Sequence, residues 1–223
     1  MARAGFITGL VSEADCLTPL IDRSNLRVAG IGPAAAQRCA RELIAQGCDL
    51  LVSFGLAGGL AAGIMPGSVI VGETVVAPDG QTFVAHKELT DALIRSIPGA
   101  RGVRLAGSAT IVATPDEKAQ LQRHTGANAV DMETYHVARC ARDAGIAFVA
   151  IRAISDPHNA RLPDAALHAV DETGVPDIKR VIAQLARRPW DLFALLRLAS
   201  HARAAHASLR RVAPVVVGGA DRL

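Results

Sequence analysis

Residues 49–60 have the sequence DLLVSFGLAGGL, an apolar run that passes directly into a cluster of glycines. The run from Asp49 to Phe54 shows no alternation between apolar and polar positions. That pattern is typical of a strand that is covered on both faces, as in an α/β fold. We therefore expect a buried central strand here, with the glycine segment Gly55–Leu60 as a tight loop at its carboxyl end.

Strands and helices alternate on both sides of this run. The apolar patterns predict strands at 5–11, 26–30, 68–77, 103–113 and 146–154, and helices at 33–46, 87–97, 133–144 and 178–212. Thr114 is expected to cap a further helix, with Pro115 at its first position. Because no repeat, linker or clear boundary interrupts residues 1–223, we predict one α/β domain whose central mixed, mostly parallel sheet is flanked by helices.

Composition narrows the functional class. Half of the 223 residues are hydrophobic but only 3% are aromatic, so the core should be aliphatic. So few aromatic side chains disfavour the stacking platforms that bind single-stranded nucleic acid, and we expect no nucleic-acid partner. Residues 50–72 carry no charge, but their glycines and Pro66 favour two buried strands over a membrane span.

Four cysteines, at positions 16, 39, 48 and 140, lack the spacing of metal ligands. Glu13 and Asp15 interrupt the first apolar run too early for a secretory signal. We expect reduced thiols in a cytoplasmic protein that uses neither a metal nor a cofactor.

The segment 178–212 is the most basic part of the chain. It contains eight basic residues against Asp191 alone, a formal charge of +7 in a chain whose total is +3. Apolar residues between 192 and 198 follow Trp190, and arginines surround them. A basic apolar helix of this kind suits peripheral contact with an anionic membrane. The alternative, which we favour slightly, is a terminal helix that covers the core and exposes its basic face to solvent.

Polar residues gather where the predicted strands end, which is where ligands bind in open α/β sheets. Glu13 follows the first strand, Glu133 opens a helix after a short apolar approach, and Ser155-Asp156 follows the last strand. Each carboxylate alone has an ordinary explanation, such as a helix cap for Asp156. The glycine segment fits neither the dinucleotide fingerprint nor a P-loop. The joint placement at strand ends is what favours a functional site.

Several of these segments match one known family. Residues 130–133, followed by a helix, a strand and residues 152–156, resemble the signature of the nucleoside phosphorylase/nucleosidase superfamily. Residues 55–60 resemble its glycine loop. Residues 5–13 resemble the first strand and glutamate of its methylthioadenosine/S-adenosylhomocysteine nucleosidases. Further motifs are similar to those of the hopanoid-associated phosphorylases: 162–163, 187–189, 195–198 and 210–211.

The resemblance implies an enzyme that cleaves the bond between a purine base and ribose. The narrower resemblance, to the hopanoid-associated phosphorylases, implies release of adenine from adenosylhopane in hopanoid biosynthesis, with phosphate or water as the acceptor. The alternatives are a nucleosidase for a small soluble nucleoside and a nucleotide-binding module without turnover. The implied partners are a lipid-linked purine nucleoside and phosphate, in a homo-oligomer that is cytoplasmic and touches the inner membrane.

The same resemblance assigns roles to individual residues. Asp156, oriented by Ser155, would protonate the leaving purine, provided that burial keeps it protonated. Glu133 would hold the ribose hydroxyls and Glu13 would be the base for an attacking water. Arg152 is expected to be structural and to pair with a nearby carboxylate.

The remaining binding positions are less polar. Met132 would pack against the sugar, and the rest of the expected substrate-binding set is Ala57, Gly58 and Ile111. Where phosphorolytic relatives carry an arginine and a serine that hold phosphate, this chain has Ser53 and Leu56. Where the nucleosidases carry a phenylalanine against the base, this chain has Thr110.

Overall fold

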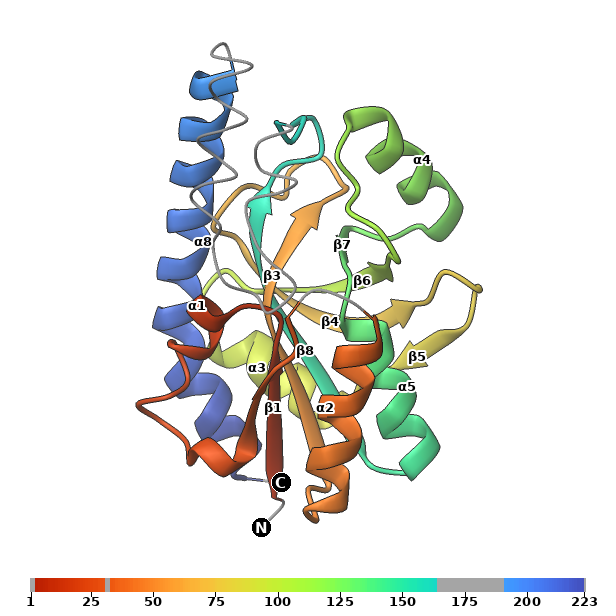
Figure 1. Cartoon of the computed structure of the whole chain (residues 1–223), viewed down its shortest axis with the longest axis vertical. Coiled ribbons are helices and arrows are strands. Elements are labelled where there is room, and N and C mark those ends of the chain that lie inside the picture. The colour runs from red at the N-terminus through yellow and green to blue at the C-terminus, as the bar shows by residue number, and fades with distance from the viewer. Residues whose placement is uncertain (1–2, 31–32, 164–190, 223) are drawn as a thin grey trace.

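The structure is a computed structural model that describes residues 3–30, 33–163 and 191–222 (Figure 1). Its strands are β1 (Ala4–Thr8), β2 (Leu26–Val28), β3 (Leu50–Gly59), β4 (Val69–Val76), β5 (Thr82–Val84), β6 (Arg101–Gly107), β7 (Ala129–Asp131) and β8 (Ala147–Asp156). Its helices are α1 (Val11–Ala14), α2 (Pro33–Ala45), α3 (Lys87–Ser96), α4 (Pro115–Thr125), α5 (Thr134–Ala144) and α8 (Asp191–Ala220), with a 3-10 turn η1 at Arg23–Asn25.

The eight strands form one mixed sheet, which confirms the predicted fold class. Five strand pairs are parallel, namely β1–β2, β1–β3, β3–β8, β4–β6 and β6–β7, and three are antiparallel, namely β3–β7, β4–β5 and β4–β8. Strand β8 bridges β3 and β4, while β7 joins β3 to β6. The order β3–β7–β6–β4–β8 therefore returns to β3, and the sheet closes on itself like a barrel.

Helices cover both faces of the sheet, α2 and α5 on one and α3 and α8 on the other (Figure 1). Successive residues of β3 point to opposite faces, so Leu51 belongs to the same core cluster as Leu43 and Val137, while Val52 belongs to that of Leu93 and Leu209. This explains the unbroken apolar run at 49–54, since both faces of β3 are buried. The core is built mainly of aliphatic side chains, as the composition predicted.

The glycine segment 55–60 corrects one expectation. It is not a tight loop, because β3 continues through it to Gly59 and pairs with β8 up to Ala57 and Gly58. Gly58 and Gly59 also pair with β7 on the other side. Two neighbours supply hydrogen bonds to this stretch, so the backbone stays extended despite its glycines.

Several boundaries also differ from the predicted ones. β1 ends at Thr8 because Val11 begins α1, and β6 ends at Gly107 rather than at residue 113. Strand β5 was not predicted. The predicted cap at Thr114 is confirmed: its hydroxyl accepts the Glu117 N–H at 3.2 Å, and the Glu117 carboxylate accepts the Thr114 N–H at 2.9 Å.

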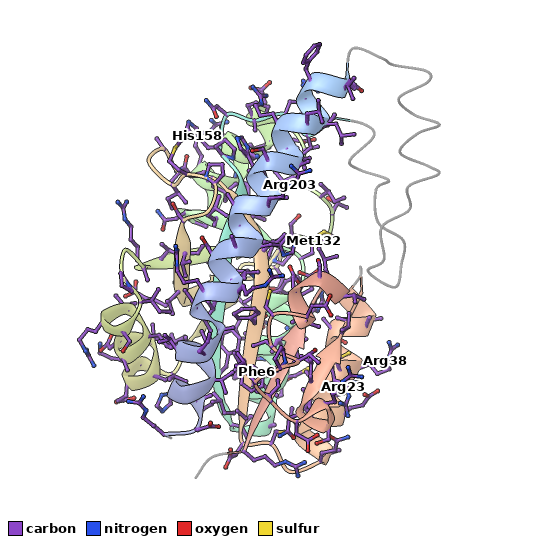
Figure 2. The ribbon with its side chains drawn as sticks, turned by 90° about the vertical axis from the view of Figure 1, so that its left-hand side faces the viewer. Phe6, Arg23, Arg38, Met132, His158 and Arg203 are labelled. Atoms are coloured by element: carbon purple, nitrogen blue, oxygen red, sulfur yellow. The ribbon has the colours of Figure 1, made fainter. Side chains whose placement is uncertain are left out.

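The C-terminal helix is only partly the predicted one. Residues 178–190 of the basic segment lie outside the described residues, and α8 continues beyond 212 to Ala220. From Ala205 onward α8 buries one face against the sheet, and Figure 2 shows it running in front of the sheet along most of the molecule. Its first turns expose Leu192, Leu196 and Phe193, the last by 82%. Among the helices described, none has the length and apolarity needed to cross a bilayer.

The end of β6 lies against α5 so closely that only glycine fits there. A Cβ on Gly107 would lie 2.3 Å from Cδ1 of the buried Tyr135. We predict that Gly107→Ala destabilises the fold by about 1–3 kcal/mol, or about 2–4 °C of Tm per kcal/mol at this length. Gly218→Ala in α8 is the matched control, because its Cβ would meet nothing closer than 3.9 Å. Equal thermal melts for the two variants would contradict this packing.

Candidate active site

One cavity of about 300 Å³ opens where β1, β3, β7 and β8 end. All eight residues that the sequence singled out lie on its wall: Asp156, Glu13, Glu133, Ser155, Met132, Ala57, Gly58 and Ile111. Ser53 does not line it, whereas Leu56 and Thr110 do. Strand pairing explains the convergence, since β3 and β8 run parallel and place Gly58 beside Asp156.

Glu13 is held by backbone N–H groups. The chain turns back at Gly9 and Leu10, and α1 points the carboxylate toward β3. Oε2 accepts the N–H of Gly9 and of Leu10, each at 2.8 Å, and Oε1 accepts the N–H of Leu56 at 2.7 Å. Gly55 leaves the necessary room, because a Cβ there would lie 2.7 Å from Oε1.

The surroundings of Glu13 shift its pKa. Burial raises the pKa of this carboxyl above its ordinary value, while Arg152 and the three backbone donors oppose the shift. A carboxyl with a raised pKa can accept a proton from water more readily than an exposed one. The position and the pKa both suit a general base.

A polar network lies beneath the cavity and centres on Arg152, which is 2% exposed. Its Nε donates to Asp131 Oδ2 at 2.6 Å, and its Nη2 donates to Ser53 Oγ at 2.7 Å and to Thr134 Oγ1 at 2.6 Å. Arg152 thus pairs with a carboxylate near the site, as expected. Ser53, which the sequence led us to compare with a phosphate-binding arginine of phosphorolytic relatives, contributes its hydroxyl to this network.

Glu133 lies at the N-cap of α5 and makes no capping hydrogen bond through its side chain. Burial, followed by the negative charge of Asp131, raises its pKa from 4.5 to about 8, although Arg152 acts in the opposite direction. A Cβ on Gly9 would lie 3.3 Å from Glu133 Cδ and 3.6 Å from Glu13 Oε2. Both carboxyls therefore lie close to Gly9, and the negative charge of Glu13 adds a smaller contribution to the raised pKa of Glu133 than burial and Asp131 do.

Asp156 ends β8 with both carboxylate oxygens engaged. Ser155 Oγ donates to Oδ1 at 2.7 Å, which is the orienting contact expected of Ser155. Lys118, on α4, forms an ion pair with Oδ2. From the sequence we expected only burial and Ser155 around Asp156, whereas the structure adds this buried ammonium.

The sequence analysis missed Lys118. It follows Asp116 and Glu117 in a charged helical stretch, which is the usual pattern of a solvated face, yet its side chain is fully buried. The only local signal was the capping box at Thr114 and Glu117, which shows where α4 begins. That signal says nothing about what α4 packs against.

The other side of the cavity is formed by residues 110–112 and Met132. Ile111 is partly exposed at the rim, and Met132 is half-buried. Among the described lining residues none is aromatic, so a purine base would contact aliphatic side chains and backbone here.

The closed α/β sheet places four carboxyl groups, those of Glu13, Asp131, Glu133 and Asp156, around one cavity at its strand ends. Carboxyl groups suit the cleavage of glycosidic bonds, the reaction class predicted from the sequence. Comparison with known proteins gives the family. A model described as Phosphorylase superfamily matches residues 23–188. The chain belongs to this superfamily.

Individual relatives agree with this assignment. A futalosine hydrolase of Streptomyces coelicolor is 32% identical over 163 residues, which cover 62% of this chain and 69% of that protein. Two solved structures share the fold at lower identity. A 5'-methylthioadenosine/S-adenosylhomocysteine nucleosidase of Neisseria meningitidis has a TM-score of 0.73 and 19% identity, covering 98% of this chain and 100% of that one. A futalosine hydrolase of Helicobacter pylori has a TM-score of 0.69 and 16% identity, covering 100% and 98%.

The raised pKa of Glu133 predicts a pH-dependent stability. The folded state favours the protonated form, so this contribution is complete below pH 4.5 and is lost as the pH rises through about 8. Each unit of pKa difference corresponds to about 1.4 kcal/mol. We expect Glu133→Gln to gain Tm relative to the wild type between pH 5 and pH 9, by several degrees, measured in thermal melts.

The matched control is Glu88→Gln, whose side chain on α3 is exposed. It should follow the wild type at every pH. If Glu133→Gln and the wild type lost stability in parallel as the pH rose, the buried protonated carboxyl would be ruled out.

Proposed function

We propose that this chain hydrolyses the N-glycosidic bond of a purine nucleoside and uses water rather than phosphate as the acceptor. The observation that carries the proposal is the position of Glu13. Its carboxylate occupies the N–H groups of Gly9, Leu10 and Leu56, which are the kind of backbone donors that otherwise bind phosphate. A carboxylate in that place also repels a second anion, and Leu56 offers no side-chain donor.

Each carboxyl has one task in this reaction. Breaking the bond leaves positive charge on the ribose and the electron pair on the base. Glu133 accepts hydrogen bonds from the ribose hydroxyls, which strengthen as the sugar becomes cationic. Water attacks the anomeric carbon and its proton passes to Glu13, while Asp156 donates a proton to the purine. The products are the free base and the sugar, which keeps any substituent that it carried in the substrate.

Adenosylhopane is the substrate that we propose on the basis of the motifs shared with hopanoid-associated phosphorylases. The exposed residues Leu192, Phe193 and Leu196 support a lipid-linked substrate, because the first turns of α8 stand at the same end of the molecule as the carboxyl ends of β3 and β8 (Figure 1). The cavity has room for a nucleoside head, and the apolar body would remain outside it. Peripheral contact with the inner membrane, a cytoplasmic location and a homo-oligomeric state stay predictions.

A second candidate is a small soluble nucleoside. The most specific reason is the 32% identical futalosine hydrolase, and the methylthioadenosine/S-adenosylhomocysteine nucleosidase shares the fold. These substrates need no apolar surface outside the cavity, so they would leave the exposed residues of α8 without a role in the reaction.

A substrate panel decides between these candidates and tests the acceptor. Purified protein is incubated with adenosylhopane, methylthioadenosine and futalosine, with and without phosphate, and the products are identified by mass spectrometry. We expect free base and unphosphorylated sugar at a rate that does not change with phosphate concentration. A saturable dependence on phosphate with a ribosyl phosphate product would exclude hydrolysis.

The assigned acid predicts a large effect of Asp156→Asn. An amide has no proton to give to a leaving purine, so kcat should fall by about 10²–10⁴-fold, the usual value of general acid catalysis. Asp143→Asn, at an exposed position on α5, is the matched control and should retain full activity. Activity of Asp156→Asn within about threefold of the wild type would reject the assignment, because so small a loss lies far below the usual effect of removing a general acid.

Glu133→Gln should reduce kcat at least as much as it raises KM.

A further inference from the structure

Lys118 carries a buried ammonium whose three N–H groups all have acceptors. The side chain is 0% exposed. Besides the ion pair with Asp156 Oδ2, Nζ donates to the backbone oxygens of Pro157 at 2.9 Å and Ala160 at 3.2 Å. An ammonium buried without partners would be strongly destabilising. The complete set of acceptors is therefore what allows a positive charge at this place.

The ammonium stands behind Asp156 as seen from the cavity. Asp156 lies on the cavity wall, whereas Lys118 is not among the described residues that line it. Ser155 holds Oδ1 and Lys118 holds Oδ2, so the carboxyl has one fixed partner at each oxygen. Lys118 therefore has no direct contact with the cavity, and the lining residue that its ammonium touches is Asp156.

The contacts with Pro157 and Ala160 alone would suit a purely structural residue. They tie α4 to the segment after β8, and the Leu162 N–H, which donates to the Ala113 oxygen at 2.8 Å, already makes a second tie between these regions. A purely structural lysine would not require the ion pair with Asp156. That pair places a fixed positive charge next to the carboxyl that is proposed to transfer the proton.

We propose that Lys118 is a positioning residue for departure of the base, an inference that rests on the proposed function. Asp156 first takes up a proton from solvent at the open cavity. When the bond between the anomeric carbon and the purine breaks, its electron pair stays on the purine and this proton moves to a ring nitrogen of the base. The carboxylate that remains faces the Lys118 ammonium, which stabilises its new charge. Lys118 thus makes Asp156 a better proton donor at the moment when the base leaves.

The test compares leaving groups that differ in their need for a proton. One substrate is the purine nucleoside that the wild type cleaves best. The other is p-nitrophenyl β-ribofuranoside, whose nitrophenolate departs unprotonated. Lys118→Gln keeps N–H donors but removes the charge, Lys118→Met removes both, and Lys87→Gln, at an exposed lysine on α3, is the matched control.

We expect Lys118→Gln to lower kcat for the purine nucleoside by about 10–100-fold with little change in KM, a smaller loss than that of the acid itself. The rate with the nitrophenyl riboside should stay within about threefold of the wild type, since that leaving group draws nothing from the general acid. Retained activity on this substrate also shows that the variant is folded. Equal losses on both substrates, or no loss on the purine nucleoside, would overturn the proposal.

A double-mutant cycle gives a second measurement that needs only the purine nucleoside. If Lys118 acts through Asp156, Lys118→Gln should cost little further activity in an Asp156→Asn background. An undiminished loss in that background would also overturn the proposal, and the cycle decides alone if the wild type does not accept the nitrophenyl riboside. Failure of the wild type to release base from any nucleoside is a different result, because it would contradict the proposed function itself.

Discussion

The buried pair between Arg152 and Asp131 holds together the elements that carry the site. Arg152 lies on β8, Asp131 ends β7, and the same guanidinium reaches Ser53 on β3 and Thr134 on α5. Breaking such a pair from one side typically costs about 3–5 kcal/mol, since it leaves an unpaired buried charge. Because Glu133 and Asp156 follow directly on the strands that this pair joins, the distances between the carboxyls of the cavity depend on it.

Besides Asp131, three carboxyls line one cavity, and their surroundings differ. Glu13 is bound by backbone N–H groups, Glu133 is desolvated beside the charge of Asp131, and Asp156 is paired with Lys118. Chemically similar groups can take different roles when their environments set different proton affinities. Here burial raises the pKa of Glu13 and of Glu133, whereas Asp156 has an ammonium beside it, so one small cavity offers different environments for base, sugar and water.

Much of the fold was predictable because local patterns repeat with the period of the element. The helices at 33–45 and 87–96 were predicted within a residue, from their apolar periodicity and their glycine or proline boundaries. The glycine segment 55–60 was misassigned, because local propensity says loop while pairing with β7 and β8 keeps it extended. Strand β5, of three residues, carries too few positions to show a pattern.

The same distinction between local sequence and tertiary contacts applies to the site. The sequence by itself determined which residues are available at the strand ends, and all eight candidates line one cavity, since parallel strands bring their carboxyl ends to one edge. Only the tertiary structure decided the charges around them. Lys118 has the local sequence of a solvated helix position, and it is buried because α4 packs against the segment after β8. Hydrogen bonds between Glu13 and Leu56, or between Arg152 and Ser53, join residues far apart in the chain, and electrostatic environment is a property of such contacts rather than of sequence neighbours.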